Sequence, residues 1–113
     1  RVGGAAGLHI QGTQVLTKVA TEGEAIELIA AILQFYREDG WYLERIYKWI
    51  DRIGLEALKA AVVEDGAGRR AFFDRFVASQ AHSQSDPWAE EAAAAGRRDY
   101  APVSILPMKA AAE

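Results

Sequence analysis

The chain has 113 residues, of which 50% are hydrophobic and 26% charged, and its formal net charge is −3. This length supports one small domain with a single modest core, and the composition is globular rather than disordered or fibrous. The acidic balance argues against a nucleic-acid partner, because nucleic-acid-binding domains carry a basic face. The absence of cysteine excludes disulfides, thiolate zinc sites and iron–sulfur ligation by these residues.

The N-terminal residues lack the basic and apolar regions of a signal peptide, and no apolar run approaches the ~20 residues that a membrane span needs. We therefore expect no membrane partner and a cytoplasmic location. Because the sequence opens with Arg1 and Val2 rather than methionine, we expect a piece of a longer polypeptide.

The first 20 residues have an extended pattern. Residues 8–11 alternate apolar with polar side chains, residues 14–19 do so more weakly, and Gly12-Thr13 lies between them as a predicted turn. A two-stranded hairpin alone is marginal in water. We therefore expect this hairpin or bent strand pair to pack on other structure.

A long helix is predicted next. Thr21 and Glu24 have the spacing of a capping box, and Asp39-Gly40 ends the helix because glycine accepts the left-handed conformation common after a helix C-terminus. Two adjacent stripes give this helix a wide apolar face: Ala25, Leu28, Ile32 and Phe35, and Ile26, Ile29, Leu33 and Tyr36. The helix is therefore predicted to lie at the centre of the core.

Two shorter helices are predicted over residues 41–53, closed by Gly54, and over residues 55–63. In the first, Glu44 and Lys48 form an i,i+4 pair on the outer face. Its inward residues are Tyr42, Ile46, Trp49, Ile50 and Ile53. The inward residues of the second are Leu55, Leu58, Val62 and Val63.

Asp65 is a predicted cap for a fourth helix that runs to about residue 80. Its ring cluster is assigned to the core and consists of Phe72, Phe73, Phe76 and Val77, whereas Arg69, Arg70, Asp74 and Arg75 face water. Asp86 and Pro87 then start a short polar helix through the alanines to Gly96. Residues 97–113 are predicted to be an extended or disordered tail.

These elements predict a mainly α (α+β) fold, in which a short N-terminal β-hairpin or strand remnant precedes four to five helices packed as a small bundle. The predicted divisions are residues 1–20, 21–96 and 97–113.

Closely spaced glycines are the first candidate for a functional site, since they let backbone amides approach phosphates or carboxylates. Gly3, Gly4 and Gly7 match neither nucleotide-binding glycine pattern, and no helix opens directly after them. Two interpretations remain open: a strand end against which another backbone packs closely, or an approach to a large anionic cofactor held by residues outside this sequence.

The other candidate residues favour structural roles. His9 and His82 have no metal-binding spacing, so we predict no metal site and place His82 in solvent at a helix end. The carboxylates fall at caps and solvated helix faces, so no catalytic residue is predicted. Aromatic residues at helical spacing indicate core more than a binding patch; they are Trp41, Tyr42, Tyr47, Trp49 and Trp88.

The N-terminal segment fits the pattern V-G-G-x-x-G-x-x-x-x-G-T-x-x-L-x-K-V-A-T. In this pattern the chain resembles the C-terminal part of the large subunit of assimilatory NAD(P)H nitrite reductases. The similarity covers residues 2 to about 90 and continues through Leu33-Gln34-Phe35-Tyr36-Arg37-Glu38, Tyr42-Leu43-Glu44-Arg45, Arg52-Ile53-Gly54 and Asp86-Pro87-Trp88.

The resemblance implies a parent enzyme that passes electrons from NAD(P)H through FAD and iron–sulfur centres to siroheme, where nitrite is reduced to ammonium. In that family the siroheme-proximal 4Fe-4S cluster is held by four cysteines upstream of this segment. The chain would then be the end of the 4Fe-4S domain, residues 1–20, plus a helical C-terminal domain. It would hold no cofactor and be inactive by itself.

The resemblance also implies a role for the N-terminal glycines, because their segment would pass close to the siroheme. On this basis the cofactor-binding candidates are Gly3, Gly4, Gly7, His9 and Gln11. The implied partners are the rest of the parent polypeptide, the nitrite reductase small subunit and a second copy in a homodimer.

Two alternatives remain: the equivalent segment of a sulfite reductase, and a free-standing helical interaction or dimerisation module. Because the hairpin lacks a larger sheet in this sequence, we expect an exposed apolar patch on the helix over residues 21–40 or on the cluster over residues 72–77.

Overall fold

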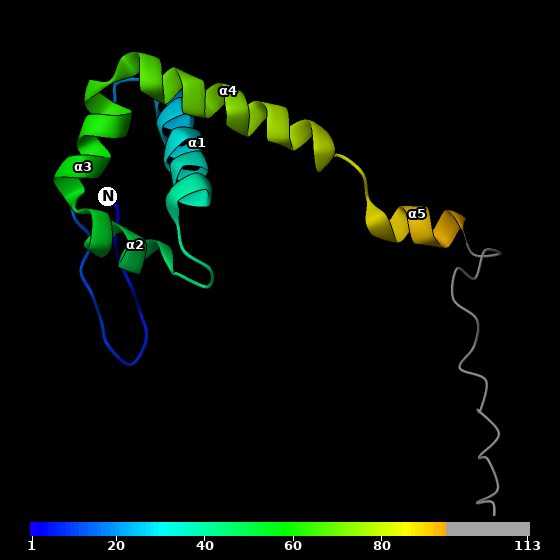
Figure 1. Ribbon diagram of the computed structural model, residues 1–113, viewed down its shortest axis with the longest axis horizontal. Helices are drawn as coiled ribbons and strands as arrows, with labels where there is room; N and C mark the ends of the chain where they lie inside the picture. Colours follow the sequence, from blue (N-terminus) through cyan, green and yellow to red (C-terminus); the bar gives the residue numbers. More distant parts are fainter. Residues whose placement is uncertain (95–113) are drawn as a thin grey trace, which may run out of the picture. The chain divides into compact units, whose positions relative to one another are not determined.

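The computed structural model describes residues 1–94, and the chain divides into one unit over residues 1–82 and a second that begins at Ser83. The first unit contains α1 (Glu22–Asp39), α2 (Ile46–Ile53), α3 (Leu55–Lys59), η1 (Ala60–Glu64) and α4 (Gly66–His82), and the second contains α5 (Pro87–Ala93) (Figure 1). The predicted mainly helical fold is confirmed. Among the described residues the only β structure is a pair of isolated antiparallel bridges near the N-terminus, so the strand remnant is not seen as a strand.

The two ends of α1 lie where the sequence predicts them, with different local chemistry. Thr21 Oγ1 accepts a hydrogen bond from the Glu24 amide at 3.2 Å, and the Glu24 carboxylate accepts from the amide of Ala20, one residue before the expected donor. Gly40 is extended, with φ −68°, rather than left-handed. A Cβ atom there would lie 2.6 Å from the Tyr36 carbonyl oxygen, so space rather than backbone conformation favours glycine.

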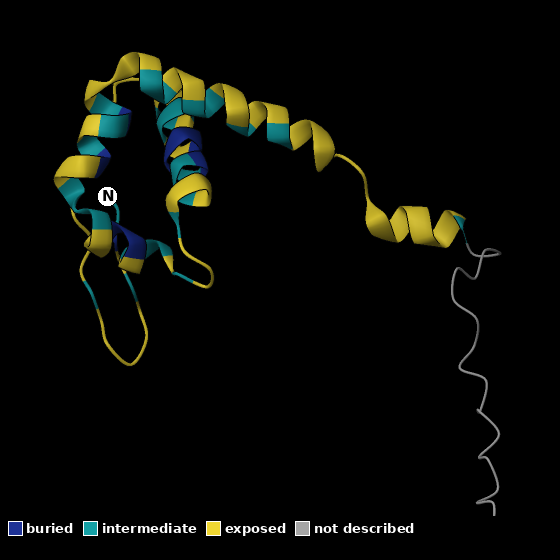
Figure 2. Cartoon of the chain, in the orientation of Figure 1, coloured by how far each residue is buried: buried dark blue, intermediate teal, exposed yellow. Residues whose placement is uncertain are grey.

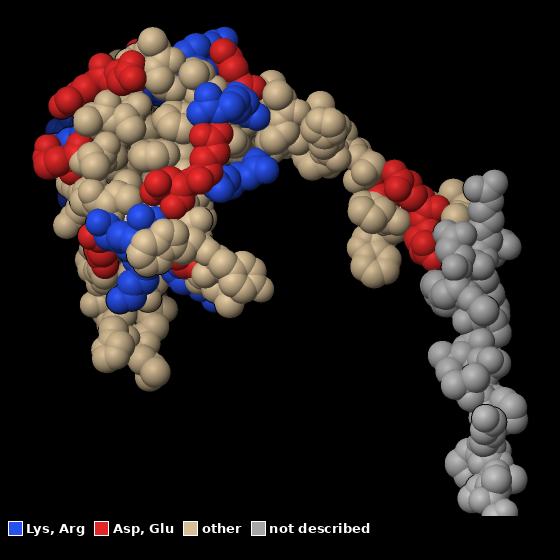
Figure 3. Space-filling view, in the orientation of Figure 1, with Lys and Arg blue, Asp and Glu red and all other residues tan. Residues whose placement is uncertain are grey.

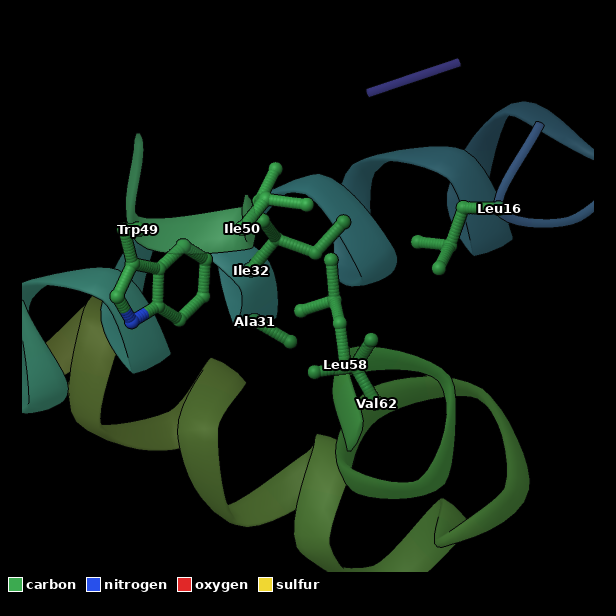
Figure 4. Close-up of a cluster of buried hydrophobic side chains, with 7 residues drawn as sticks. All are labelled: Leu16, Ala31, Ile32, Trp49, Ile50, Leu58 and Val62. Carbon is green, nitrogen blue, oxygen red and sulfur yellow. The ribbon is translucent and has the colours of Figure 1, made fainter. Parts of the chain in front are cut away.

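The core lies between α1, α2 and the α3–η1 segment. Trp49, Leu58 and Val62 are its largest fully buried side chains. Leu16, which follows the N-terminal hairpin, joins them with Ala31, Ile32 and Ile50 (Figure 4). Figure 2 shows this buried surface on the helix faces that point inward in the first unit. The hairpin is therefore joined to the same core as the helices.

Aromatic contacts organise the centre of this core. The Phe35 ring meets Trp49 edge-on, with centroids 5.1 Å apart, and lies 5.0 Å from the ring of Phe72 on α4. The buried Trp49 Nε1 donates to the Asp39 carboxylate at 2.7 Å, which satisfies its polar atom as a buried indole requires. Trp49 therefore belongs to the core, as its helical spacing predicts.

The predicted start of the second helix is wrong by five residues, because α2 begins at Ile46 rather than at residue 41. Residues 42–43 form a turn in which Leu43 has φ +61°, and the Glu44 amide donates to the Trp41 carbonyl at 3.0 Å. Tyr42 is consequently exposed rather than inward. Glu44 precedes the helix and pairs with Arg52 at 2.8 Å instead of with Lys48.

The predicted third helix is confirmed, although its second half widens into a π-helical turn closed by the Asp65 amide on the Ala60 carbonyl at 3.2 Å. Asp65 also accepts from the Gly68 amide at 2.9 Å, as predicted for a cap. Helix α4 then packs along α1.

Side chains of α4 only partly follow the prediction. Phe72, Phe73 and Phe76 are half-buried, but Val77 is exposed and does not belong to the core. Arg69 does not simply face water, because its guanidinium lies 3.1 Å from the Glu27 carboxylate of α1. Arg75 similarly lies 2.6 Å from Glu38. These ion pairs tie α4 to α1 at two points.

In the second unit, Asp86 caps α5 by accepting from the Trp88 and Ala89 amides at 3.0 and 3.3 Å, with Pro87 as the first helical residue. The capping prediction is confirmed, and α5 ends at Ala93. Trp88 is exposed rather than core. The predicted tail over residues 97–113 lies outside the described residues.

Candidate functional site

The N-terminal hairpin carries the five predicted cofactor-proximal residues, and its register differs from the one predicted. Val2 pairs with Gln14 and Ala5 with Gln11, each through two backbone hydrogen bonds of 2.8 to 3.1 Å. Residues 6–10 therefore form the loop, and the predicted turn at Gly12-Thr13 is wrong. Alternation alone could not reveal this register, because the polar and apolar residues of the loop are all exposed.

Gly3 lets the ladder change phase between these two pairs. In a regular antiparallel ladder, hydrogen-bonded pairs recur at every second residue, but Val2 and Ala5 are three residues apart. Gly3 adopts φ +80° within this interval, a conformation that glycine reaches without the steric cost of a side chain. It is buried, and a Cβ atom there would lie 3.8 Å from Ile50.

Gly4 is required by space. A Cβ atom at this position would lie 2.5 Å from Thr13 Cγ2 on the opposite strand. By contrast, Gly7 and Gly12 have no atom within 4 Å of a built Cβ and no left-handed backbone. The close-packing interpretation therefore explains Gly4, and the left-handed backbone explains Gly3, whereas nothing in the described residues requires glycine at Gly7.

The remaining two candidates, Gln11 and His9, differ in their surroundings. Gln11 donates to the Asp51 carboxylate of α2 at 3.0 Å, which holds the hairpin beside that helix. His9 is exposed at the loop and lines an open groove of about 500 Å³ with Gly7, Arg45 and Tyr47. The hairpin thus separates the five predicted residues into a packed stem, which contains Gly3 and Gly4, and an exposed tip.

A second and mainly apolar groove of about 640 Å³ runs along the hairpin stem. Its helical wall is formed by Ile32, Ile46 and Ile50. Ala5 and Ala6 line both grooves. These two residues therefore border both the apolar groove and the groove that Arg45 lines.

Sequence reasoning missed a polar cluster at the start of α2. The Glu44 carboxylate accepts from Arg52 Nε and Nη2 at 2.8 and 2.9 Å and from the Trp41 amide at 2.9 Å. The Arg52 guanidinium also stacks 4.2 Å from the centroid of the Trp41 ring. The separation of eight residues between Glu44 and Arg52 matches no helical neighbour spacing, so the sequence carried no signal of this pair.

Charge and hydrogen bonding in this cluster shift the pKa values of Glu44 and Arg52, and both shifts favour the charged form. The hydrogen bonds from Arg52 hold the pKa of the Glu44 carboxyl below its ordinary range, and Glu44 raises the pKa of Arg52. The Arg75 guanidinium likewise lowers the pKa of Glu38 at the contact between α1 and α4. These carboxylates are therefore ionised at neutral pH, so each acts as a fixed hydrogen-bond acceptor rather than as a proton donor.

The donor chemistry of this chain does not fit a 4Fe-4S cluster. The sequence contains no cysteine, and among residues 1–94 no three His, Asp or Glu side chains gather as a metal site. Thiolate ligands are what such clusters require. Within the same residues, no helix combines the length and apolar character that crossing a membrane requires.

The fold defines a small helical domain, described over residues 1–94, with an N-terminal hairpin whose stem depends on Gly3 and Gly4 and whose tip is exposed. Residues 1–70 match the model of the nitrite and sulphite reductase 4Fe-4S domain, and the chain belongs to this family. The resemblance noted from the glycine pattern is thereby confirmed. The match includes the hairpin, α1, α2, α3 and η1 and ends in the first turns of α4.

Two relatives from Bacillus subtilis (strain 168) agree with this assignment. The chain is 37% identical over 87 residues to an NAD(P)H nitrite reductase, which covers 77% of this chain and 11% of the relative. It is 30% identical over 64 residues to an assimilatory nitrate reductase electron transfer subunit, covering 57% of this chain and 8% of the relative. The chain thus spans about a tenth of the length of these relatives. No solved structure matches it significantly.

Proposed function

We propose that the chain is the C-terminal structural part of the large subunit of an NAD(P)H nitrite reductase. The whole polypeptide would reduce nitrite to ammonium in the cytoplasm with electrons from NAD(P)H, passed through FAD, an iron–sulfur cluster and siroheme. The observation that carries the proposal is the 37% identity to a nitrite reductase over 77% of this chain. That similarity is joined to a family match over residues 1–70.

The proposed contribution of this part is structural. The chain offers no cysteine for a cluster, so the cluster ligands must come from other residues of the polypeptide. The buried faces of α1, α2 and α3 are committed to their own core. We therefore propose that these helices support the catalytic part and that the 113-residue segment is inactive when alone.

A siroheme-proximal role for the hairpin remains part of this proposal. Siroheme carries carboxylates, which favour backbone amides and cationic groups as neighbours. Within residues 1–94 the amides of residues 7–10 donate no hydrogen bond, and His9 is exposed beside them. Among the five candidates, Gly7 and His9 lie at the exposed tip, whereas Gly3 is buried and the Gln11 side chain already donates to Asp51.

The first test is to express the gene product from its native start codon and to record its absorption spectrum and its NAD(P)H-dependent nitrite consumption. Siroheme bands together with nitrite turnover are expected in the long form, and the 113-residue chain serves as a colourless blank. A colourless and inactive long form, despite an adequate supply of siroheme, would contradict the proposal.

A sulfite reductase is the second candidate, because the matched family contains nitrite and sulphite reductases alike. Turnover of sulfite in preference to nitrite by the same long form would favour it. The expected result is the opposite, since the relative with the greater coverage is a nitrite reductase.

A further inference from the structure

Two loops at the α2 end of the first unit expose large apolar side chains. The hairpin tip presents Leu8, which is fully exposed, and Ile10, which is 86% exposed. Figure 1 shows this tip and the loop between α1 and α2 projecting from the same end of residues 1–82. In Figure 3 both projections are mainly uncharged and basic atoms lie between them.

The loop between α1 and α2 exposes three large apolar or aromatic side chains, against two in the hairpin tip. Trp41, Tyr42 and Leu43 are 67%, 93% and 81% exposed. Leu43 also has φ +61°, a left-handed conformation that costs a non-glycine residue about 1–2 kcal/mol. This strained backbone directs the Leu43 side chain toward solvent, where it is 81% exposed. Backbone strain of this kind is concentrated at functional positions.

This loop is nevertheless held rigidly. Glu44 bonds the Trp41 amide and receives two bonds from Arg52, as described above, and the Tyr36 hydroxyl donates to the Glu44 carbonyl. Arg52 also donates to the Asp39 carbonyl at 3.0 Å. An exposed apolar loop that is fixed before binding loses little entropy on contact with a partner, which is the advantage of preorganisation.

Arg45 lies between the two loops. It lines the groove of the hairpin tip together with His9 and Tyr47. It also lines a third groove, of about 450 Å³, together with Leu43 and Tyr36. Its guanidinium has no ion pair or hydrogen bond among residues 1–94. Arginine surrounded by exposed aromatic and aliphatic side chains is the composition typical of energetically important interface residues.

We infer that the hairpin tip, Arg45 and residues 41–43 form one docking face, which binds the cluster-bearing part of the same reductase polypeptide through apolar contacts and a carboxylate opposite Arg45. This inference rests on the proposed function. The relative with the greater coverage is about nine times as long as the aligned segment. The matched 4Fe-4S domain must take its cluster ligands from residues outside this cysteine-free chain.

Because the part that carries those ligands belongs to the same matched domain, we expect it to contact residues 1–70. Within that range, the most exposed large apolar side chains lie on the docking face. The other exposed large apolar residues of residues 1–70 are only 44–57% exposed, and they are Val15, Val19, Ile26 and Ile29. The docking face therefore concentrates the apolar surface that a partner would remove from water.

The test measures hydrogen–deuterium exchange in the reductase polypeptide expressed from its native start, as wild type and as Leu43→Gly. Glycine relieves the left-handed strain at residue 43, so the variant is expected to fold at least as well. We expect slow exchange at residues 7–10 and 42–43 in the wild type, and residue 44 is left out because its amide already donates to the Trp41 carbonyl. In Leu43→Gly both segments should exchange about tenfold faster or more, because one occupant covers both.

Two further variants make this result specific. Arg45→Gln removes the cation without changing the apolar loops and should accelerate exchange at residues 7–10 as well. Val77→Ala is the matched control, since Val77 is a half-exposed aliphatic residue of α4 outside the family match, and it should leave both segments unchanged. Acceleration confined to residues 42–43 in Leu43→Gly would mean a local effect and would overturn the shared occupant.

The remaining outcomes separate the two proposals. Fast exchange at both loops in a wild-type polypeptide that holds its cofactors and turns over nitrite would overturn the docking face alone. Protection that depends on protein concentration would assign the face to a second copy and overturn the stated occupant. A native gene product without cofactors or turnover would overturn the proposed function and, with it, the occupant.

Discussion

Substitution of Gly4 by alanine tests whether the hairpin glycines serve the chain's own packing. The new methyl group would lie 2.5 Å from Thr13 Cγ2, well inside the separation of any ordinary carbon contact. Overpacking of a well-packed core costs about 1–3 kcal/mol, and here rotation of the exposed Thr13 side chain relieves part of the clash. The strain is transmitted to global unfolding because the hairpin leads directly into Leu16, which is part of the buried core. We therefore expect the free energy of unfolding to fall by about 1 kcal/mol, the lower end of that range.

Thr13→Ser supplies the matching change, because serine lacks Cγ2. The next nearest atom of residue 13 is its Cβ, which lies 3.8 Å from the built methyl group at an ordinary van der Waals distance. The double variant should accordingly recover most of the stability that Gly4→Ala loses. Urea unfolding followed by far-UV circular dichroism, with all four members of the double-mutant cycle, measures the coupling directly.

Gly7→Ala is the control within the same hairpin. No atom lies within 4 Å of its built Cβ, so alanine there should be neutral or stabilise the chain by up to about 1 kcal/mol through the unfolded state. Equal effects of Gly4→Ala and Gly7→Ala, or a failure of Thr13→Ser to restore stability, would refute the packing explanation.

Three other changes test the core, the first cap and the ion pair. Leu58→Ala removes a fully buried side chain and should lower the free energy of unfolding by about 2–5 kcal/mol, as measured by urea unfolding. Thr21→Ala removes the acceptor for the Glu24 amide and should lower the thermal midpoint through a loss of about 1 kcal/mol; an unchanged midpoint would mean that this cap contributes nothing. Because Arg52 lowers the folded-state pKa of Glu44, the stabilisation is fully present above the unfolded pKa of about 4.3 and is lost as pH falls through the lower folded value. Glu44→Gln should therefore weaken the loss of stability between about pH 5 and pH 3, which acid titration of unfolding curves would detect.

The apolar patches expected from the sequence are present in part. On α1, Ile26 and Ile29 are exposed, and on α4 Val77 is exposed while its neighbour Phe72 packs against the core. The sequence did not point to the most exposed apolar residues, which lie in the hairpin tip and the loop after α1. A residue is exposed at these positions because of the loop's path, and hydrophobic periodicity contains no information about that path.

Local signals were sufficient for most of the helix ends, with the start of α2 as the exception. The capping residues Thr21, Asp65 and Asp86 and the terminators Gly40 and Gly54 act on neighbours within a few residues, so their effect is written in the sequence. The glycine pattern likewise indicates the family from the sequence alone. The inferred role of the five hairpin residues beside siroheme stays a prediction, as do the divisions at residues 20 and 96.

Only the tertiary structure decided the features that join distant residues. The hairpin register depends on the left-handed Gly3 and on the contact between Gly4 and Thr13, which local alternation cannot reveal because it assumes a regular ladder. The late start of α2 follows from the Glu44–Arg52 pair and the turn at Leu43, which together outweigh the helical pattern of the intervening residues. Short-range propensities are encoded residue by residue, whereas pairings across the fold exist only after the chain has brought their partners together.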